Sequence, residues 1–148
     1  MIQEYCGVRV STSLRLAIPT SHIQEILQLK SDEIAPIPGV ISAVLGALNH
    51  KGNLLWVMHS EKFLRIKPTP LGSRFLAVVI SQQNCRVACS ALGIEGLLTI
   101  DDQKLVSLPD RLPKLAKQLF KGIAKTDGFP HAVFDPKSLF LSLNPELI

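Results

Sequence analysis

Residues 43–58 read AVLGALNHKGNLLWVM, and this stretch decides how the rest of the chain can fold. Aliphatic residues stand on both sides of a polar tip, residues 50–53, in which glycine follows lysine. Glycine supplies the positive backbone dihedral angle that a tight turn between two strands needs. The stretch therefore predicts a β-hairpin with its tip at 50–53. Its almost continuously apolar arms predict that both faces of this hairpin are covered.

Short apolar runs separated by turn signals continue on both sides of this hairpin. Apolar residues alternate with others over residues 5–18, a period of two that predicts a second hairpin. Gly96 lies inside a later apolar run and predicts a β-bulge or a close backbone approach. Many short strands joined by turns favour small β-barrels. The remaining strands are expected at 75–81, 85–91, 94–100, 123–124 and 131–134.

Short helices are expected where the strands change direction. Ser21, with a glutamine three residues later, fits a capping box and predicts one helical turn after the first hairpin. Ser60 is expected to cap a second turn over 60–64. Residues 109–121 carry apolar side chains on one face and predict a helix that ends at Gly122. Asp135 is expected to cap a last helix whose first residue is a proline.

Composition places the chain among ordinary globular proteins. It has 148 residues, of which 47% are hydrophobic and 19% charged. Two independent halves of this size would be marginal, so we expect them to share apolar surface, with a proline-rich boundary near 67–73. No apolar run reaches the roughly 18 residues that span a bilayer, and the first residues lack a secretion signal. A cytoplasmic protein with three free thiols is therefore expected.

No pattern of reactive residues emerges from the sequence. The net charge of +4, with one Trp and one Tyr, is weak evidence for nucleic acid. Cys85 and Cys89 lack metal-ligand spacing to any histidine pair, and no nucleophile elbow or phosphate loop occurs. We therefore expect no catalytic residue, no metal and no cofactor, and we favour a binding module over an enzyme. A basic small β-barrel that binds nucleic acid is the alternative, and a small metalloenzyme is the third hypothesis.

Three segments carry a family resemblance in order and spacing. They are 23–26 (IQEI), 34–39 (IAPIPG) and 44–57 (VLGALNHKGNLLWV). Together they resemble the CheW-like family, which shows a Val-x-Glu-Ile segment, a proline-containing link and a Gly-x-x-Asn-x-Arg-Gly hairpin. The second half of the chain matches more loosely. The resemblance implies an all-β fold with short helices, in which two five-stranded SH3-like or OB-like barrels share a core within a single domain, 1–148.

The resemblance also implies a function. Members are non-catalytic adaptors of chemotaxis-type signal transduction that couple methyl-accepting receptors to a CheA-type histidine kinase. One surface would engage the regulatory domain of the kinase, and a groove between the barrels would receive the cytoplasmic tip of the receptor. The protein would act at receptor arrays on the inner face of the membrane, without inserting into it and without binding nucleic acid. By position, the partner contacts fall on Glu25, Asn49, Lys51 and Gly52.

The chain departs from the family pattern at several positions. Lys51 stands where the family usually has arginine, so a planar two-pronged contact is lost. His59 and Ser60 replace an Asp-Leu pair, and Leu92 falls where an aspartate is usual. These changes predict a divergent branch with its own kinase and receptor. At Trp56 the chain resembles relatives that serve surface motility by type IV pili, including light-guided systems.

Overall fold

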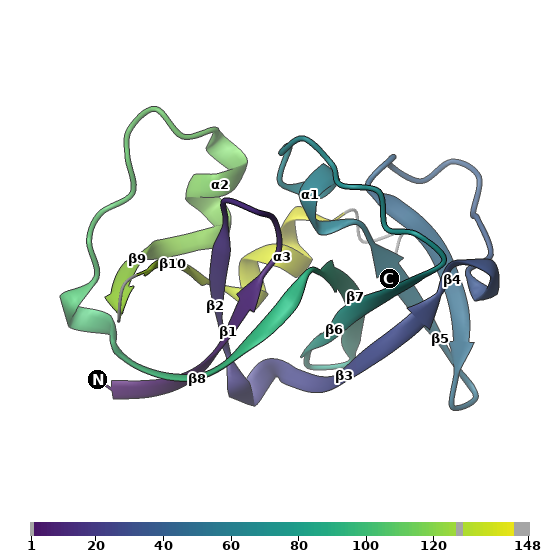
Figure 1. Ribbon diagram of the computed structural model, residues 1–148, viewed down its shortest axis with the longest axis horizontal. Coiled ribbons are helices and arrows are strands. Elements are labelled where there is room, and N and C mark those ends of the chain that lie inside the picture. The colour runs from purple at the N-terminus through teal and green to yellow at the C-terminus, as the bar shows by residue number, and fades with distance from the viewer. Residues whose placement is uncertain (1, 127–128, 144–148) are drawn as a thin grey trace.

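The structure, a computed structural model, describes residues 2–126 and 129–143. Within these residues, strands form two five-stranded sheets, ordered β8-β1-β2-β10-β9 and β3-β6-β7-β5-β4 (Figure 1). The strands are β1 (Ile2–Arg9), β2 (Arg15–Pro19), β3 (Ile23–Lys30), β4 (Val44–His50), β5 (Asn53–Met58), β6 (Arg74–Gln82), β7 (Cys85–Ala91), β8 (Gly93–Asp101), β9 (Phe120–Thr126) and β10 (Phe129–Phe134). The helices are α1 (Ser60–Phe63), α2 (Lys114–Leu119) and α3 (Pro136–Ser142), and 3-10 turns span Thr20–His22, Ser31–Glu33 and Asp102–Lys104.

The chain passes twice between the two sheets. The first sheet combines the N-terminal hairpin β1-β2 with β8, β9 and β10, whereas the second holds the middle of the chain, β3 to β7. The crossings fall at the 3-10 turn Thr20–His22 and between β7 and β8. Residues 67–73 connect α1 to β6. Both β6 and β5, the strand before α1, lie in the second sheet. A subdomain boundary at 67–73 stays a prediction.

The two sheets have the same pattern of strand pairing, although their strands follow one another differently along the chain. In each, one pair of strands is parallel, β5 with β7 and β10 with β2, and the other pairs are antiparallel. In each, the segment after an edge strand and a 3-10 turn forms an isolated bridge with the opposite edge strand. These bridges join Ala35 to Ala47 in the second sheet and Val106 to Ile123 in the first. The bridges close both sheets into barrel-like units.

Glycine permits this closure in both sheets. A Cβ atom on Gly46, whose φ is +146°, would collide with the carbonyl oxygen of Ala35. A Cβ atom on Gly122 would lie 3.0 Å from the carbonyl oxygen of Val106. Gly122 was predicted to end a helix, and this prediction is wrong, because Gly122 lies inside β9. Both glycines lie where the bridging segment crosses the edge strand. Because glycine has no Cβ atom, the two backbones can approach each other there.

Both faces of the central strands are buried. On β6, Val78 and Ile80 belong to an apolar cluster that also contains Val8 and Ile18 of the first sheet. The alternate residue Val79 points into a cluster inside the second barrel. Each fully buried aliphatic side chain of this kind contributes about 1.5–3 kcal/mol of transfer free energy. The two halves therefore share a core, as the composition suggested.

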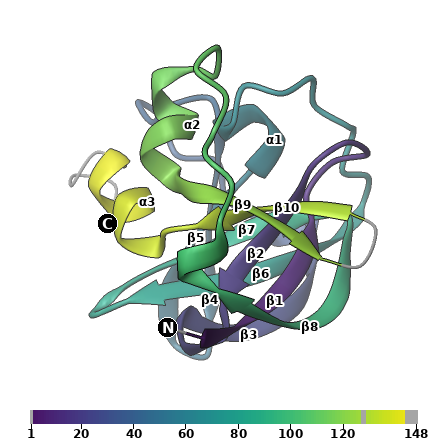
Figure 2. The same ribbon diagram turned by 90° about the vertical axis from the view of Figure 1, so that its left-hand side faces the viewer.

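Helices α2 and α3 complete the shared core. Figure 2 shows them side by side on one side of the molecule, next to β9 and β10. Leu119 at the end of α2 and Leu139 in α3 are fully buried in the cluster between the sheets. The backbone N–H of Asp135 donates to the carbonyl oxygen of Leu119 at 2.8 Å and joins the two helices. Within the described residues, no helix is long and apolar enough to cross a membrane.

The hairpin predictions are confirmed. β1 pairs with β2, and β4 pairs with β5 around the expected tip. On β5, Leu55 and Val57 face the barrel interior while Trp56 and Met58 face the shared core, so both faces of this arm are covered. The bulge at Gly96 is also confirmed, because Gly7 pairs with Gly96 and the next residue pairs with Ile94. All three cysteines are free.

Two predicted helical features in the first half are wrong. The capping box at Ser21 does not form: a 3-10 turn covers Thr20–His22 without a side-chain cap, and β3 begins at Ile23. Pairing of β3 with β6 overrides the local signal, because the strand buries alternate residues against the sheet. The cap of α1 is His59, whose ring accepts from the Lys62 N–H, and not Ser60.

The second half needs a further correction. The expected helix 109–121 is shorter at both ends, since α2 begins at Lys114 and ends at Leu119, and Phe120 starts β9. Pairing of Phe120 with Phe134 on β10 makes the extended conformation the better one there. The cap of α3 is confirmed, because the Asp135 carboxylate accepts from the Lys137 N–H at 3.2 Å. Residues 127 and 128, between the expected strands 123–124 and 131–134, lie outside the described residues.

Candidate functional site

The tip of the β4-β5 hairpin is a two-residue turn. His50 pairs with Asn53, and the two residues between them, Lys51 and Gly52, have φ of +53° and +81°. Positive φ at both central positions is the signature of a type I′ turn, whose twist matches that of the strands. The Asn49 side-chain oxygen accepts from the Gly52 N–H at 3.0 Å and fixes the turn. Asn49 and Gly52 thus have structural roles at the tip.

Glu25 reaches this tip from the opposite edge of the second sheet. A bulge in β3 leaves Gln24 without a paired residue on β6, because Ile23 pairs with Ile80 and Glu25 pairs with Val79. Such an extra residue re-aims the side chains that follow it. The Glu25 carboxylate lies 2.9 Å from His50 Nε2 and 3.5 Å from the Lys51 ammonium. The structure therefore brings the four predicted site residues together at one end of the barrel.

The carboxylate is held mainly by the histidine. Its hydrogen bond to His50 lowers the pKa of Glu25, partial burial opposes this, and the charge of Lys51 adds to the lowering. The Lys51 side chain is 71% exposed, whereas the side chains of Glu25 and His50 are 25% and 17% exposed. The lysine contact is long and faces water, so it is weak. The Lys51 ammonium therefore remains accessible at the outer end of the hairpin.

Sequence reasoning missed His50. It treated this residue only as part of the polar tip and as one of four imidazoles without metal spacing. The contact joins β3 to β4, which are not neighbours in the hydrogen-bonded order of the sheet. A single sequence carries no register signal between such strands. The one available hint was a titratable residue at the end of an apolar arm, directly before the tip.

An open groove adjoins the tip. It has a volume of about 630 Å³ and lies between β5, the start of β3 and the β6-β7 turn. Its apolar lining includes Leu54, which is 61% exposed, and the half-buried Trp56. Arg86 also lines it and has one buried guanidinium nitrogen without a hydrogen-bond partner among the described residues. This end of the molecule combines an exposed cation with exposed apolar surface.

The receptor groove that the resemblance implies between the barrels stays a prediction. The space between the two sheets measures about 20 Å³ and is lined by aliphatic side chains of both sheets. Phe63 of α1 and Leu139 of α3 also line it.

Comparison with known proteins agrees with the fold and with the resemblance. The family model of the CheW-like domain matches residues 4–144. The chain belongs to the CheW-like domain family, which consists of generally non-catalytic scaffolding domains. No curated protein sequence matches the chain.

The fold is shared with solved structures. The scaffolding protein TtCheW from Thermoanaerobacter tengcongensis is similar with a TM-score of 0.77 and 14% identity, over 91% of this chain and 90% of that one. At this identity the likeness shows the fold alone. The predicted all-β fold with two five-stranded units and short helices is therefore confirmed.

Proposed function

We propose that this protein is a non-catalytic adaptor of a chemotaxis-type signalling system, coupling methyl-accepting receptors to the regulatory domain of a CheA-type histidine kinase. The observation that carries the proposal is the hairpin tip. There Lys51 is exposed, the Glu25 carboxylate below it is held by His50, and Leu54 offers apolar surface beside them. Membership of a scaffolding family supports it.

The tip suits a partner surface on physical grounds. The type I′ turn and the Glu25–His50 contact hold the hairpin end in one conformation, so little entropy is lost when a partner binds. An exposed ammonium beside apolar area favours orientation and association rate over raw affinity. Lysine offers a single charge without the planar fork of arginine, so the partner contact here would differ from that of relatives with arginine. The proposed location is the cytoplasmic face of receptor arrays.

The proposal is tested by co-sedimentation with a CheA-type regulatory domain and with receptor-containing membranes. Lys51→Glu should reduce capture of the kinase domain, of receptor membranes, or of both, while the protein stays folded with at most a small loss of stability, since the Lys51–Glu25 contact faces water. Lys117→Glu, an exposed lysine on α2 in the other half, is the matched control and should bind as wild type. Equal capture by the two variants would remove the tip from the interface.

The nucleic-acid alternative is tested by salt dependence. Binding to phosphates weakens steeply with added salt because counterions are released. Duplex or single-stranded DNA that fails to bind at about 50 mM salt, where phosphate contacts are strong, would exclude this alternative.

A further inference from the structure

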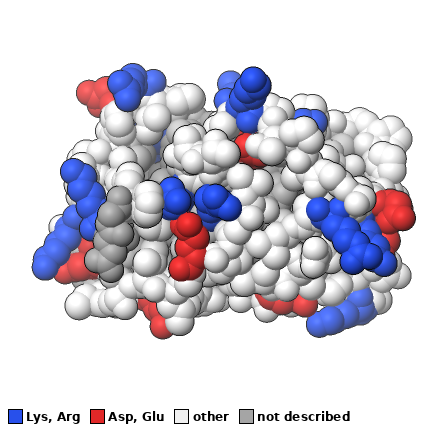
Figure 3. Space-filling view, viewed as in Figure 1, with Lys and Arg blue, Asp and Glu red and all other residues white. Residues whose placement is uncertain are grey.

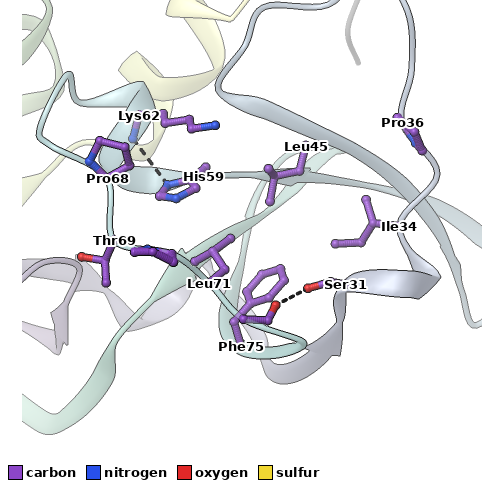
Figure 4. A pocket seen from close by; sticks show the side chains of 12 residues that line it. Ser31, Ile34, Pro36, Leu45, His59, Lys62, Pro68, Thr69, Leu71 and Phe75 are labelled. Atoms are coloured by element: carbon purple, nitrogen blue, oxygen red, sulfur yellow. Dashed lines mark hydrogen bonds between the residues drawn. The ribbon is translucent and has the colours of Figure 1, made fainter.

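The opposite end of the second barrel contains an apolar pocket that the hairpin tip does not touch. It has a volume of about 470 Å³ and opens between the end of β3, α1 and the segment before β6 (Figure 4). Ile34, Leu45 and Leu71 form its walls together with Phe75, and they pack against the core of the second barrel. Binding pockets for small ligands and peptide side chains commonly measure about 300–1,000 Å³.

Hydrogen bonds hold the wall of this pocket that residues 68–72 form. The buried Glu61 carboxylate accepts hydrogen bonds from the Thr69 backbone N–H at 3.0 Å and from the Thr69 hydroxyl at 3.1 Å. The Ser31 hydroxyl also donates to the Gly72 carbonyl oxygen. Prolines at 68 and 70 further restrict the backbone. Hydrogen bonds thus hold the segment 68–72 at Thr69 and at Gly72, so this wall of the pocket has a fixed position.

Two residues that line the pocket can donate hydrogen bonds, the exposed Lys62 and His59, which is 4% exposed. His59 Nδ1 accepts from the Lys62 N–H at 3.5 Å, which leaves Nε2 as the ring atom that can donate. The Lys62 ammonium has no ion pair or hydrogen bond among the described residues, and its side chain lies beside the pocket in Figure 4. The nearby Glu61 carboxylate is 3% exposed and uses both oxygens on Thr69. A molecule entering the pocket therefore meets the Lys62 ammonium at the rim.

Further cations flank the pocket-lining residues in the sequence. Arg65, Lys67 and Arg74 are exposed, and none of them forms an ion pair within the part of the chain that the structure describes. In Figure 3, blue side chains gather over the α1 region and again where β3 ends and β6 begins, on either side of the pocket-lining segment. Exposed acids are fewer here: Asp32 and Glu33 follow β3, and Glu33 pairs with Lys30 at 4.0 Å. The rim is complementary to negative charge.

We infer that this pocket docks an acidic segment of a partner protein, with an apolar side chain against Leu45 and Leu71 and carboxylates facing Lys62. This inference deepens the adaptor role and rests on it. A nucleic acid fits less well, because the two aromatic rings that line the pocket, Phe75 and His59, are 7% and 4% exposed and offer no platform for a base. The pocket lies apart from the Glu25 site, so both can be occupied at once.

The probe is a synthetic ten-residue peptide with a central Leu-Phe pair between aspartates and glutamates. It is titrated into the full-length protein while backbone amide NMR signals are recorded. Saturable shifts are expected at Leu45, His59, Lys62 and Leu71, with the Trp56 indole N–H unchanged, since that residue lines the groove at the other end. Lys62→Glu should weaken binding about fivefold, and Lys117→Glu should change it less than about twofold.

Two further peptides decide what the pocket recognises. Replacing Leu-Phe by Ser-Ser should abolish the shifts at Leu45 and Leu71, and replacing the acids by lysines should abolish binding. Absence of saturable shifts, equal binding of the Ser-Ser peptide, or displacement of the peptide by a DNA duplex would each overturn the inference. Kinase-domain capture is measured on the same Lys62→Glu sample. If the wild type does not bind the peptide and Lys62→Glu still captures the kinase domain, the pocket inference is wrong and the adaptor proposal stands.

Discussion

The Glu25 carboxylate accepts a hydrogen bond from His50 Nε2 at 2.9 Å across the seam between β3 and β4. These strands are the two edge strands of the second sheet. The contact therefore joins the two edges of this sheet beside the proposed partner surface. At the other end of the seam, the same edges are joined by the backbone bridge between Ala35 and Ala47. A side-chain contact and a backbone bridge thus close one barrel at two places.

This contact predicts a pH dependence of stability. The pKa of Glu25 is lowered in the folded state, so its stabilising contribution is present above the ordinary pKa of a glutamate and is lost as pH falls through the lowered pKa. Glu25→Gln resembles the protonated form and lacks this contribution at every pH. The difference in unfolding free energy between wild type and Glu25→Gln should therefore be largest near neutral pH and shrink toward pH 3. Urea titrations at several pH values measure it, and a difference independent of pH would contradict the assignment.

The closing bridge predicts a strong effect at Gly46. Gly46→Ala should destabilise the protein by about 3 kcal/mol or more, because the new Cβ meets the Ala35 carbonyl oxygen at a positive φ. Gly39→Ala is the control, since its φ of +85° is also positive but nothing lies within 4 Å of the added atom. It should cost about 1 kcal/mol. Urea unfolding of both variants measures the difference, and similar costs would mean that the crossing backbones can move apart.

Two neighbouring leucines on β5 are expected to differ widely in the stability lost when each is replaced by alanine. Leu55 is fully buried inside the second barrel, so Leu55→Ala should destabilise by about 2–5 kcal/mol. Leu54, the preceding residue, is 61% exposed, and Leu54→Ala should change stability by less than about 0.5 kcal/mol. The same unfolding assay compares them. A large cost at Leu54 would place it in a packed interior and not on a free surface.

Much of the fold could be predicted from the sequence because strands and turns are local signals. The lysine-glycine tip and the apolar arms around it fixed the β4-β5 hairpin, and the isolated Gly96 marked a bulge. β3 was missed because Ser21 carries a helical start signal, while the alternation after it becomes meaningful only when β6 lies alongside. The end of α2 was misplaced for a similar reason, since Phe120 is drawn into β9 by its partner on β10.

The candidate site could be predicted only in part. Glu25 and Lys51 entered through the family resemblance, and the structure brings them within 3.5 Å. His50 could not be found, because its partner lies across a seam that no local pattern describes. The pocket at the other end of the barrel was equally invisible, since its walls come from segments separated by about 40 residues of chain, such as Ile34 and Phe75.

The last prediction separates the tip from the core as the source of a binding defect. Leu48 is 7% exposed and packs inside the second barrel, so Leu48→Asp buries an unpaired charge and should unfold the protein. Leu54→Asp places the same charge on exposed surface beside Lys51 and should leave the unfolding transition unchanged. If the tip is the partner surface, Leu54→Asp should lose capture of the kinase domain or the receptor membranes while remaining folded. Circular dichroism and co-sedimentation of both variants measure this. Undiminished capture of both partners by folded Leu54→Asp would leave the apolar side of the tip outside the interface.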